Sequence, residues 1–359
     1  MITKRKPVLK SAIDKTGEPK VKNGNSAGPQ RKISKESLVE NLQRLEPQRI
    51  AIRNHGGLGM ALAAPAIISH ILDVNLFEIV LGDSILPVVG SWTLMIVLAL
   101  VGLGFGISSW KKYKKYKSQF KKNIVGPIFR SIAPQLFYRS DSAVGQHIYN
   151  SSKIFKRKCD RYSGDDHVTG KIGQTDIEFS ELHTEYYTTV QTKNGKRKRW
   201  HTIFRGLFFT ADFHKHINGE TYILPDFVEK RFGIVGKFLQ KRNPLKHAKN
   251  LVQLENPLFE KEFAIYASDE QEARYCLTPK MMEDLLALKQ QFPRSKMYCS
   301  ILGSKIHIAL TMKNQFEQRV WRQGADPKQI DQMANLFKNL TSIVEQLNLN
   351  TRIWSKKAS

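Results

Sequence analysis

Cysteine is scarce in this chain, which has three cysteines, Cys159, Cys276 and Cys299, among 359 residues. They are odd in number, lie far apart and form no Cys-x-x-Cys pair, which argues against a disulfide framework and against a zinc site built from thiolates. Such usage favours a reducing compartment. The first fifty residues also lack an apolar run, so the sequence predicts no signal peptide.

Charge is missing from one long segment. The 25 residues from Ile85 to Ser109 carry no charged side chain, and at about 1.5 Å per residue they cover roughly 37 Å, enough to cross a bilayer. A second uncharged segment, residues 57–72, is shorter and contains Pro65. It is long enough for a short span, a re-entrant segment or an interfacial helix.

The basic residues decide between these alternatives. The formal net charge is +25, and much of the excess flanks the apolar region, whereas the stretch between the two apolar segments is acidic. Because basic flanks prefer the cytoplasmic side, we predict a two-helix transmembrane hairpin over residues 55–110 with both termini in the cytoplasm. Gly102 and Gly106, and Gly57 and Ala61, have the small-residue spacing that lets two membrane helices approach closely.

A polybasic segment follows the hairpin at residues 111–122. We predict that it continues the helix, with aromatic residues at the membrane interface and lysines on anionic lipid head groups. The lysines are Lys111, Lys112, Lys114, Lys115, Lys117, Lys121 and Lys122. A plain stop-transfer cluster is the alternative interpretation.

The remaining segments complete the expected organisation. Residues 1–33 have the composition of a disordered basic tail, and residues 34–54 have the apolar spacing of an amphipathic helix. Residues 123–359 contain strand patterns followed by helix patterns without a βαβ rhythm. We therefore predict an α+β domain with an antiparallel sheet and flanking helices.

Within this domain, Asn194-Gly195 predicts a hairpin between strands at 175–192 and 200–209. The basic run Lys193–Arg199 lies at the tip of this hairpin, where it is either a solvated loop or a contact for lipid head groups or nucleic acid. Thr278-Pro279 predicts the start of a helix, followed by strands at 296–302 and 304–311, and Asp326-Pro327 opens a last amphipathic helix.

Three stretches together resemble the bacterial domain-of-unknown-function family 3137, over roughly residues 55–312. They are Phe204–Lys215, Val252–Phe263 and Tyr266–Pro279, of which the Asp269-Glu-Gln-Glu-Ala-Arg-Tyr275 stretch is the most specific. The resemblance implies a pair of membrane helices before a cytoplasmic domain in the bacterial inner membrane, and it implies no activity.

Several polar residues in these stretches are candidate site residues. Asp212, His214 and His216 alternate, so on a strand they would share one face, as metal ligands require; surface or core histidines are the commoner outcome. Structural or ligand candidates are Asp212, Glu255, Asp269, Glu272 and Arg274. For Arg274 we predict a buried clamp that pairs with Asp212, Glu255, Glu260 or Glu272.

No catalytic signature accompanies these residues. Phosphate-binding loops, the Gly-x-Gly-x-x-Gly and His-Glu-x-x-His motifs and the Gly-x-Ser-x-Gly elbow are missing. We therefore predict a membrane-anchored cytoplasmic binding or scaffold module for a protein or lipid partner, with no cofactor and no nucleic-acid partner. The alternative is a membrane-tethered enzyme of unrecognised class that uses Asp212, His216, Glu272 and Arg274.

Overall fold

The computed structural model describes residues 34–72, 88–192, 195–213, 215–225, 250–312, 316, 320–321, 326–347 and 349. The predicted basic tail, residues 1–33, and the stretch between the two apolar segments, residues 73–87, lie outside the described residues. Two long helices come first in the described chain, α1 (Lys35–Leu72) and α3 (Val88–Phe120). A π-helical turn, η1 (Lys121–Val125), joins α3 to α4 (Gly126–Ile132).

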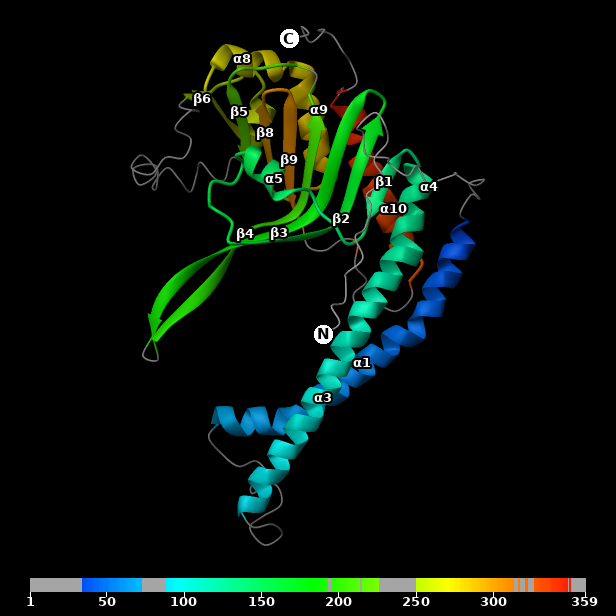
Figure 1. Cartoon of the computed structure of the whole chain (residues 1–359). Helices are drawn as coiled ribbons and strands as arrows, with labels where there is room; N and C mark the ends of the chain where they lie inside the picture. Colours follow the sequence, from blue (N-terminus) through cyan, green and yellow to red (C-terminus); the bar gives the residue numbers. More distant parts are fainter. Residues whose placement is uncertain are drawn as a thin grey trace, which may run out of the picture. The chain divides into compact units, whose positions relative to one another are not determined.

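Both long helices run through the boundaries expected from the sequence. α1 combines the predicted amphipathic helix with the first apolar segment, and α3 continues without a break from the uncharged run into the lysines. Figure 1 shows α1 bent along its length, as expected for a helix that contains Pro47 and Pro65. Only α3 with its continuation, residues 93–132, has the length and apolar character of a membrane span among the described helices.

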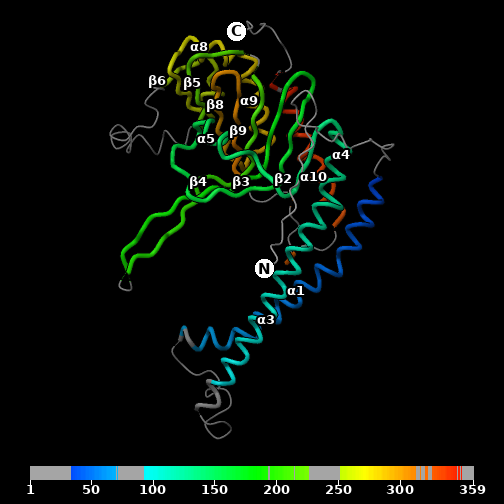
Figure 2. The backbone as a smooth tube through the Cα atoms, viewed as in Figure 1, coloured from blue at the N-terminus to red at the C-terminus, as the bar shows by residue number. Residues whose placement is uncertain are grey.

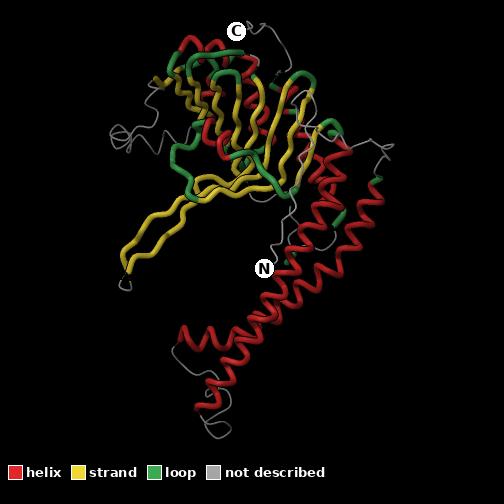
Figure 3. Tube along the Cα trace, viewed as in Figure 1, coloured by secondary structure: helices red, strands yellow, loops and turns green. Residues whose placement is uncertain are grey.

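The described residues of the domain that follows form one sheet of nine strands, each antiparallel to its neighbours, as predicted (Figures 1 and 3). The strand order is β1-β2-β3-β4-β9-β8-β5-β7-β6. The first four strands are β1 (Leu136–Arg139), β2 (Arg161–Ile172), β3 (Thr175–Thr192) and β4 (Gly195–Asp212). The others are β5 (Glu220–Pro225), β6 (Asn250–Val252), β7 (Phe263–Ala267), β8 (Met297–Leu302) and β9 (Lys305–Thr311).

Helices cover the sheet on both faces. They are α5 (Gln146–Ser151), α7 (Pro257–Glu262), α8 (Glu270–Cys276), α9 (Pro279–Gln291), α10 (Lys328–Thr341) and α11 (Ile343–Gln346). The larger core joins α9 and α10 to one face, for example Leu285 and Phe337 with Ile308. The smaller core joins Tyr149 of α5 to Phe208 on the other face. Successive residues of β4 and β9 point to opposite faces of the sheet, so apolar residues of these strands contribute to both cores.

Local sequence signals explain several of these elements. Thr278 caps α9 by accepting a hydrogen bond from the Met281 amide, at 3.3 Å, and proline occupies the first turn, as predicted. α8 begins at Glu270, and Asp269 is its N-cap. The carboxylate of Asp269 accepts from the Glu272 amide at 3.0 Å.

The last turns of α3 belong to this domain core. Tyr116 and Phe120 are each 2 % exposed and pack in the larger core with Leu42 and Leu45 of α1. The predicted aromatic face at the membrane interface is therefore wrong for these two residues, because the domain covers them. The periodicity was sufficient to identify an apolar face, but it did not identify what that face contacts.

β3 and β4 are far longer than their neighbours. Beyond Glu185 on β3 and before Gly206 on β4, the two strands pair only with each other, and Thr192 lies opposite Gly195. They form a two-stranded ribbon that extends past the sheet, visible in Figures 1 and 2. The expected loop 195–199 is thus part of β4, and the turn residues 193–194 lie outside the described residues.

Candidate functional site

A cluster of buried charges lies where α3 meets the sheet. The Lys121 ammonium is 2.7 Å from a carboxylate oxygen of Asp165 and 2.6 Å from one of Asp166. Lys117, one turn earlier on the same helix, is 3.0 Å from Asp165. The Tyr138 hydroxyl donates a 2.5 Å hydrogen bond to the other Asp166 oxygen. Lys121 and Asp166 are 2 % and 1 % exposed, so this is a desolvated ion pair.

Irregular backbone on both sides brings these charges together. Lys121 begins the π-helical turn η1, which rotates the helix at this point. Asp166 lies in a β-bulge of β2 between Asp165 and Val168 and has a φ of 57°, in the left-handed region. A non-glycine residue in that region costs free energy, and such outliers collect at functional sites and tight junctions.

The pKa values of the two aspartates are shifted in opposite directions, upwards for Asp166 and downwards for Asp165. Burial raises the pKa of Asp166 to about 6, although the attraction of Lys121 partly offsets it. Burial also opposes ionisation of Asp165, but the combined attraction and hydrogen bonding of Lys121 and Lys117 lower its pKa below the ordinary value. Burial, with the negative charge of Asp166 nearby, raises the pKa of Tyr138, which therefore stays a hydrogen-bond donor.

A third carboxylate, Glu181, completes an acidic group. Ligand-type oxygens of Asp165, Asp166 and Glu181 all lie within 4.8 Å of one another, the spacing of a cation site. The Lys121 ammonium already contacts two of these carboxylates, so the cluster holds its counter-charge within the chain. We interpret the group as a charge cluster that fixes α3 to β2.

A polar cleft of about 260 Å³ opens beside the cluster. Its lining combines polar and charged residues of α3, β2, β3 and β4 with two small residues, Gly164 and Gly206. The polar and charged residues include Lys117, Asp165, Glu181, His183 and Arg205. A Cβ on Gly206 would overlap the Leu310 carbonyl oxygen, and one on Gly164 would overlap that of Glu181. The two glycines therefore let neighbouring strands approach under the cleft.

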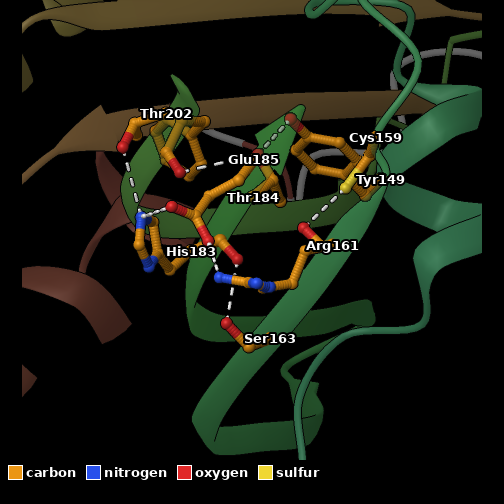
Figure 4. A network of polar contacts seen from close by, with 9 residues as sticks. Tyr149, Cys159, Arg161, Ser163, His183, Thr184, Glu185 and Thr202 are labelled. Atoms are coloured by element: carbon orange, nitrogen blue, oxygen red, sulfur yellow. Dashed lines mark hydrogen bonds and ion pairs between the residues drawn. The ribbon is translucent and has the colours of Figure 1, made fainter. Parts of the chain in front are cut away.

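The rim of the cleft continues into a polar network at the base of the ribbon (Figure 4). Arg161 pairs with Glu185 at 3.0 Å, and Glu185 also lies 3.7 Å from His183, whose Nε2 is 3.3 Å from the Thr202 hydroxyl. On the inner side, the Tyr149 and Thr184 hydroxyls are 2.9 Å apart. These contacts brace β2, β3 and β4 where the ribbon leaves the sheet.

The alternative metal group comprised Asp212, His214 and His216. β4 ends at Asp212, and His216 lies beyond the strand. His216 is exposed, with Nδ1 3.2 Å from the Ser304 hydroxyl, and His214 lies outside the described residues. Asp212 and His216 therefore do not share a strand face.

Two of the other candidates hold backbone in place. The Glu272 carboxylate accepts hydrogen bonds from the amides of Asn218 and Gly219, at 3.1 and 2.6 Å, and so fixes the turn before β5. Asp269 caps α8. Glu255 is exposed. The sequence pointed to Asp269 and Glu272 as structural or ligand candidates but did not indicate the backbone amides that they contact.

The predicted clamp is wrong for Arg274. Its side chain is 44 % exposed and pairs with Glu270 at 2.8 Å, one turn earlier on the same helix. The physical reason is the short length of α8, which buries Ala273 and Cys276 and leaves the neighbouring positions in solvent. An exposed pair of this kind contributes little to stability.

The lysines of residues 111–122 divide into two groups. Lys121 is buried against carboxylates, so the predicted lipid contact is wrong for it, and Lys117 also faces Asp165. The other members, Lys111, Lys112, Lys114, Lys115 and Lys122, are exposed. Asp165 and Asp166 were not among the residues predicted from the sequence. The one available signal was that Lys117 and Lys121 share a helix face with apolar residues.

Comparisons with known proteins support the family resemblance. Residues 202–349 match the family model described as protein of unknown function (DUF3137), which confirms the resemblance over this part of the chain. The match begins within β4, so it contains Asp212 and Glu272 but not Lys121 or Asp166, and it ends later than the expected limit of residue 312. A search among curated proteins gives no match.

Among solved structures, the crystal structure of the mycobacterial trehalose monomycolate transport factor A, TtfA, is similar to part of this chain. The alignment covers 62% of this chain and 96% of that one, at 9% identity and a TM-score of 0.29. A similarity this distant carries no argument about fold or function.

Proposed function

We propose that the chain is a membrane-anchored binding or scaffold module whose α+β domain lies in the cytoplasm, at the bacterial inner membrane. The observation that carries the proposal is the exposed aliphatic surface of the long helices. On α3, Ile96, Leu100 and Leu103 are 57, 62 and 58 % exposed, and on α1, Ile67 and Ile71 are 56 and 73 % exposed. Apolar surface of this extent is expected to face lipid or a partner.

In its more detailed form, the proposal is that both α1 and α3 span the bilayer. α1 and α3 approach closely at Gly59 and Gly102, where a Cβ on either residue would come within 3 Å of the other's carbonyl oxygen. Close backbone approach through small residues is the way membrane helices pack. Of the two pairs expected from spacing, Gly102 and Gly106 border this contact, since a Cβ on Gly59 would also lie 3.2 Å from the Gly106 amide nitrogen, whereas a Cβ on Gly57 would meet nothing within 4 Å.

The exposed lysines at the end of α3 fit an anionic lipid surface. Lys111, Lys112, Lys114, Lys115 and Lys122 follow directly after the uncharged run. The Lys114 ammonium lies 3.9 Å from the ring centre of Trp110, an aromatic–basic pair typical of a membrane interface. Each such lysine near anionic lipid contributes about 1 kcal/mol.

An enzyme is the less supported alternative. Three of its four proposed residues have local partners, because Glu272 binds backbone amides, Arg274 pairs with Glu270 and His216 lies against Ser304. Asp212 lies opposite Lys305 at the end of β4. These contacts favour a binding or scaffold role for this part of the domain.

The anchor is tested by extraction of the full chain from membranes with alkaline carbonate. The wild-type chain should stay with the membrane, and the double variant Leu100→Lys/Leu103→Lys should be extracted in larger part, since each charge at a span centre costs about 2.5–3.5 kcal/mol. Leu258→Lys is the matched control, because Leu258 is also exposed but lies on α7 of the sheet domain. Extraction of the wild-type chain would contradict the proposal.

The helix pair has its own matched test. Gly102→Leu should lower the melting temperature of the full chain in micelles, because its Cβ would meet the Gly59 carbonyl, whereas Gly104→Leu should not, since nothing lies within 4 Å of a Cβ there. Equal melting of the two variants would contradict the close pairing of α1 and α3.

A further inference from the structure

The free part of the β3–β4 hairpin, residues 186–192 and 195–202, is called here the basic ribbon. It pairs with no other described strand, because β2 pairs with β3 only up to Glu185 and β9 pairs with β4 only from Gly206 onwards. At its base, Asp160 accepts a 3.0 Å hydrogen bond from the Tyr187 amide. An isolated two-stranded ribbon is marginally stable in water, so its extension past the sheet suggests a contact there.

The charge of the ribbon has one sign. Between residues 186 and 202 the sequence has five basic residues and no acidic one. Four of them, Lys196–Arg199, lie on β4 and are all exposed. Because side chains alternate along a strand, Lys196 and Lys198 face one side, and Arg197 and Arg199 the other. Positive charge therefore surrounds the free end of the ribbon.

The aromatic residues of the ribbon are already occupied. At its base, cations of the chain lie over three rings, at 3.8 to 4.2 Å from the ring centres. These pairs are Arg161 over Trp200, Arg157 over Tyr186 and Lys198 over Tyr187. Tyr187 and Trp200 also pack edge to face, and Tyr186 stacks on His201. Rings engaged in this way stiffen the base and leave less free surface for stacking with nucleotide bases.

We propose that the basic ribbon is a second membrane-contact element, which docks its free end on the anionic lipid head groups of the bilayer that anchors the chain. Charge complementarity selects the partner, since a fluid layer of phosphates neutralises both faces of a ribbon end at once. Single-stranded nucleic acid would need open aromatic faces. Addition of a peptide strand is disfavoured by the row of basic side chains on β4, a common guard of free edges.

The proposal rests on the membrane anchor proposed above and adds a contact that the anchor does not need. Each basic side chain near an anionic surface raises binding by about fivefold. Replacement of all four is therefore expected to weaken the ribbon's contact by about a hundredfold or more. Salt at high concentration should have the same effect, because the Debye length falls from about 10 Å at 0.1 M to about 3 Å at 1 M.

The experiment uses the full chain in proteoliposomes, labelled with an environment-sensitive dye at Gln191→Cys. This position is exposed and lies opposite Lys196, and the three native cysteines are 8, 1 and 0 % exposed, so background labelling is low. Vesicles contain either phosphatidylcholine alone or phosphatidylcholine with about one third phosphatidylglycerol. The measured quantities are the emission shift of the dye and its protection from a soluble quencher.

The ribbon variant is K196Q/R197Q/K198Q/R199Q. The control variant replaces four exposed basic residues elsewhere in the domain with glutamine. These are Lys261, Arg294, Lys328 and Lys338. We expect a blue shift and protection only in the anionic vesicles, their loss in the ribbon variant and in high salt, and their retention in the control variant. Both variants should melt like the wild-type chain.

Other results overturn the proposal. If the chain stays anchored but the dye behaves alike in both vesicle types, the ribbon does not bind lipid, although the anchor stands. If an oligonucleotide or polyglutamate shifts the dye in phosphatidylcholine vesicles while anionic lipid does not, the partner is one of those polymers. If the wild-type chain leaves the membrane in carbonate, the proposed function itself fails.

Discussion

Replacement of Lys121 with methionine should destabilise the domain more than any other exchange of a lysine in residues 111–122. The side chain is 2 % exposed and its ammonium lies 2.6 Å from Asp166, which is 1 % exposed. Methionine fills a similar volume but leaves Asp166 and Asp165 facing each other without a buried cation. Removal of one partner from a buried ion pair costs roughly 3–5 kcal/mol.

Protonation of Asp166 should relieve part of that cost in acid. Burial already raises the pKa of this carboxyl to about 6 in the presence of Lys121, and loss of the lysine raises it further. Because the native state then binds a proton that the unfolded state releases, the loss of stability of the variant relative to the wild-type chain should become smaller as the pH falls from 8 towards 5. At pH 8 the full cost of about 3–5 kcal/mol should be seen.

The assay is urea unfolding of the full chain in nanodiscs, followed by circular dichroism of the sheet domain, at pH 8 and pH 5. Lys122→Met is the matched control, since Lys122 is exposed on the next position, and it should change the free energy of unfolding by less than about 0.5 kcal/mol. The double variant Lys121→Met/Asp166→Asn should recover part of the loss. Equal stability of the two single variants at pH 8 would refute the buried pair.

Four further substitutions test other contacts. His307 is 3 % exposed beside Phe208, and burial lowers its pKa to about 4. The unfolded state therefore binds a proton first, and the stability of the domain falls as the pH drops from about 6.5 to 4. His307→Leu should remove up to about 3 kcal/mol of this loss in acid, and an unchanged dependence of stability on pH would contradict the burial of His307. Glu272→Ala should cost about 2–3 kcal/mol in urea unfolding and Arg274→Ala under about 0.5, and the reverse order would reject their assigned contacts. Gly206→Ala should cost about 3 kcal/mol or more, measured the same way, and wild-type stability would show that the strands have room for a methyl group.

Patterns local in sequence predicted much of the fold. The uncharged run and its lysines gave α3, the Thr278-Pro279 pair gave the start of α9, and alternation gave β8 and β9. These signals arise from helix capping, strand pleat and hydrophobic periodicity, which depend on neighbours a few residues away. They do not depend on the tertiary partner of each face.

The site was predicted less well because its contacts are distant in sequence. Lys121 meets Asp166 across 45 positions, and that contact depends on a π-helical turn and a bulge that leave no clear trace in the residue pattern. Arg274 illustrates the converse, since apolar neighbours suggested burial whereas the nearest acid, Glu270, lies on its own helix in solvent. Side-chain type indicates the need for a partner, and the fold determines which one is near.

The proposed two-span arrangement of α1 and α3 can be tested in whole cells by labelling single introduced cysteines with a membrane-impermeant maleimide. The native cysteines are buried and give little background. A two-span anchor with both termini inside predicts that Asn75→Cys reacts in intact cells, whereas Glu40→Cys and Ser359→Cys react only after the membrane is opened. Reaction of either terminal cysteine in intact cells, or protection of Asn75→Cys, would contradict the membrane-anchored cytoplasmic module proposed for this chain.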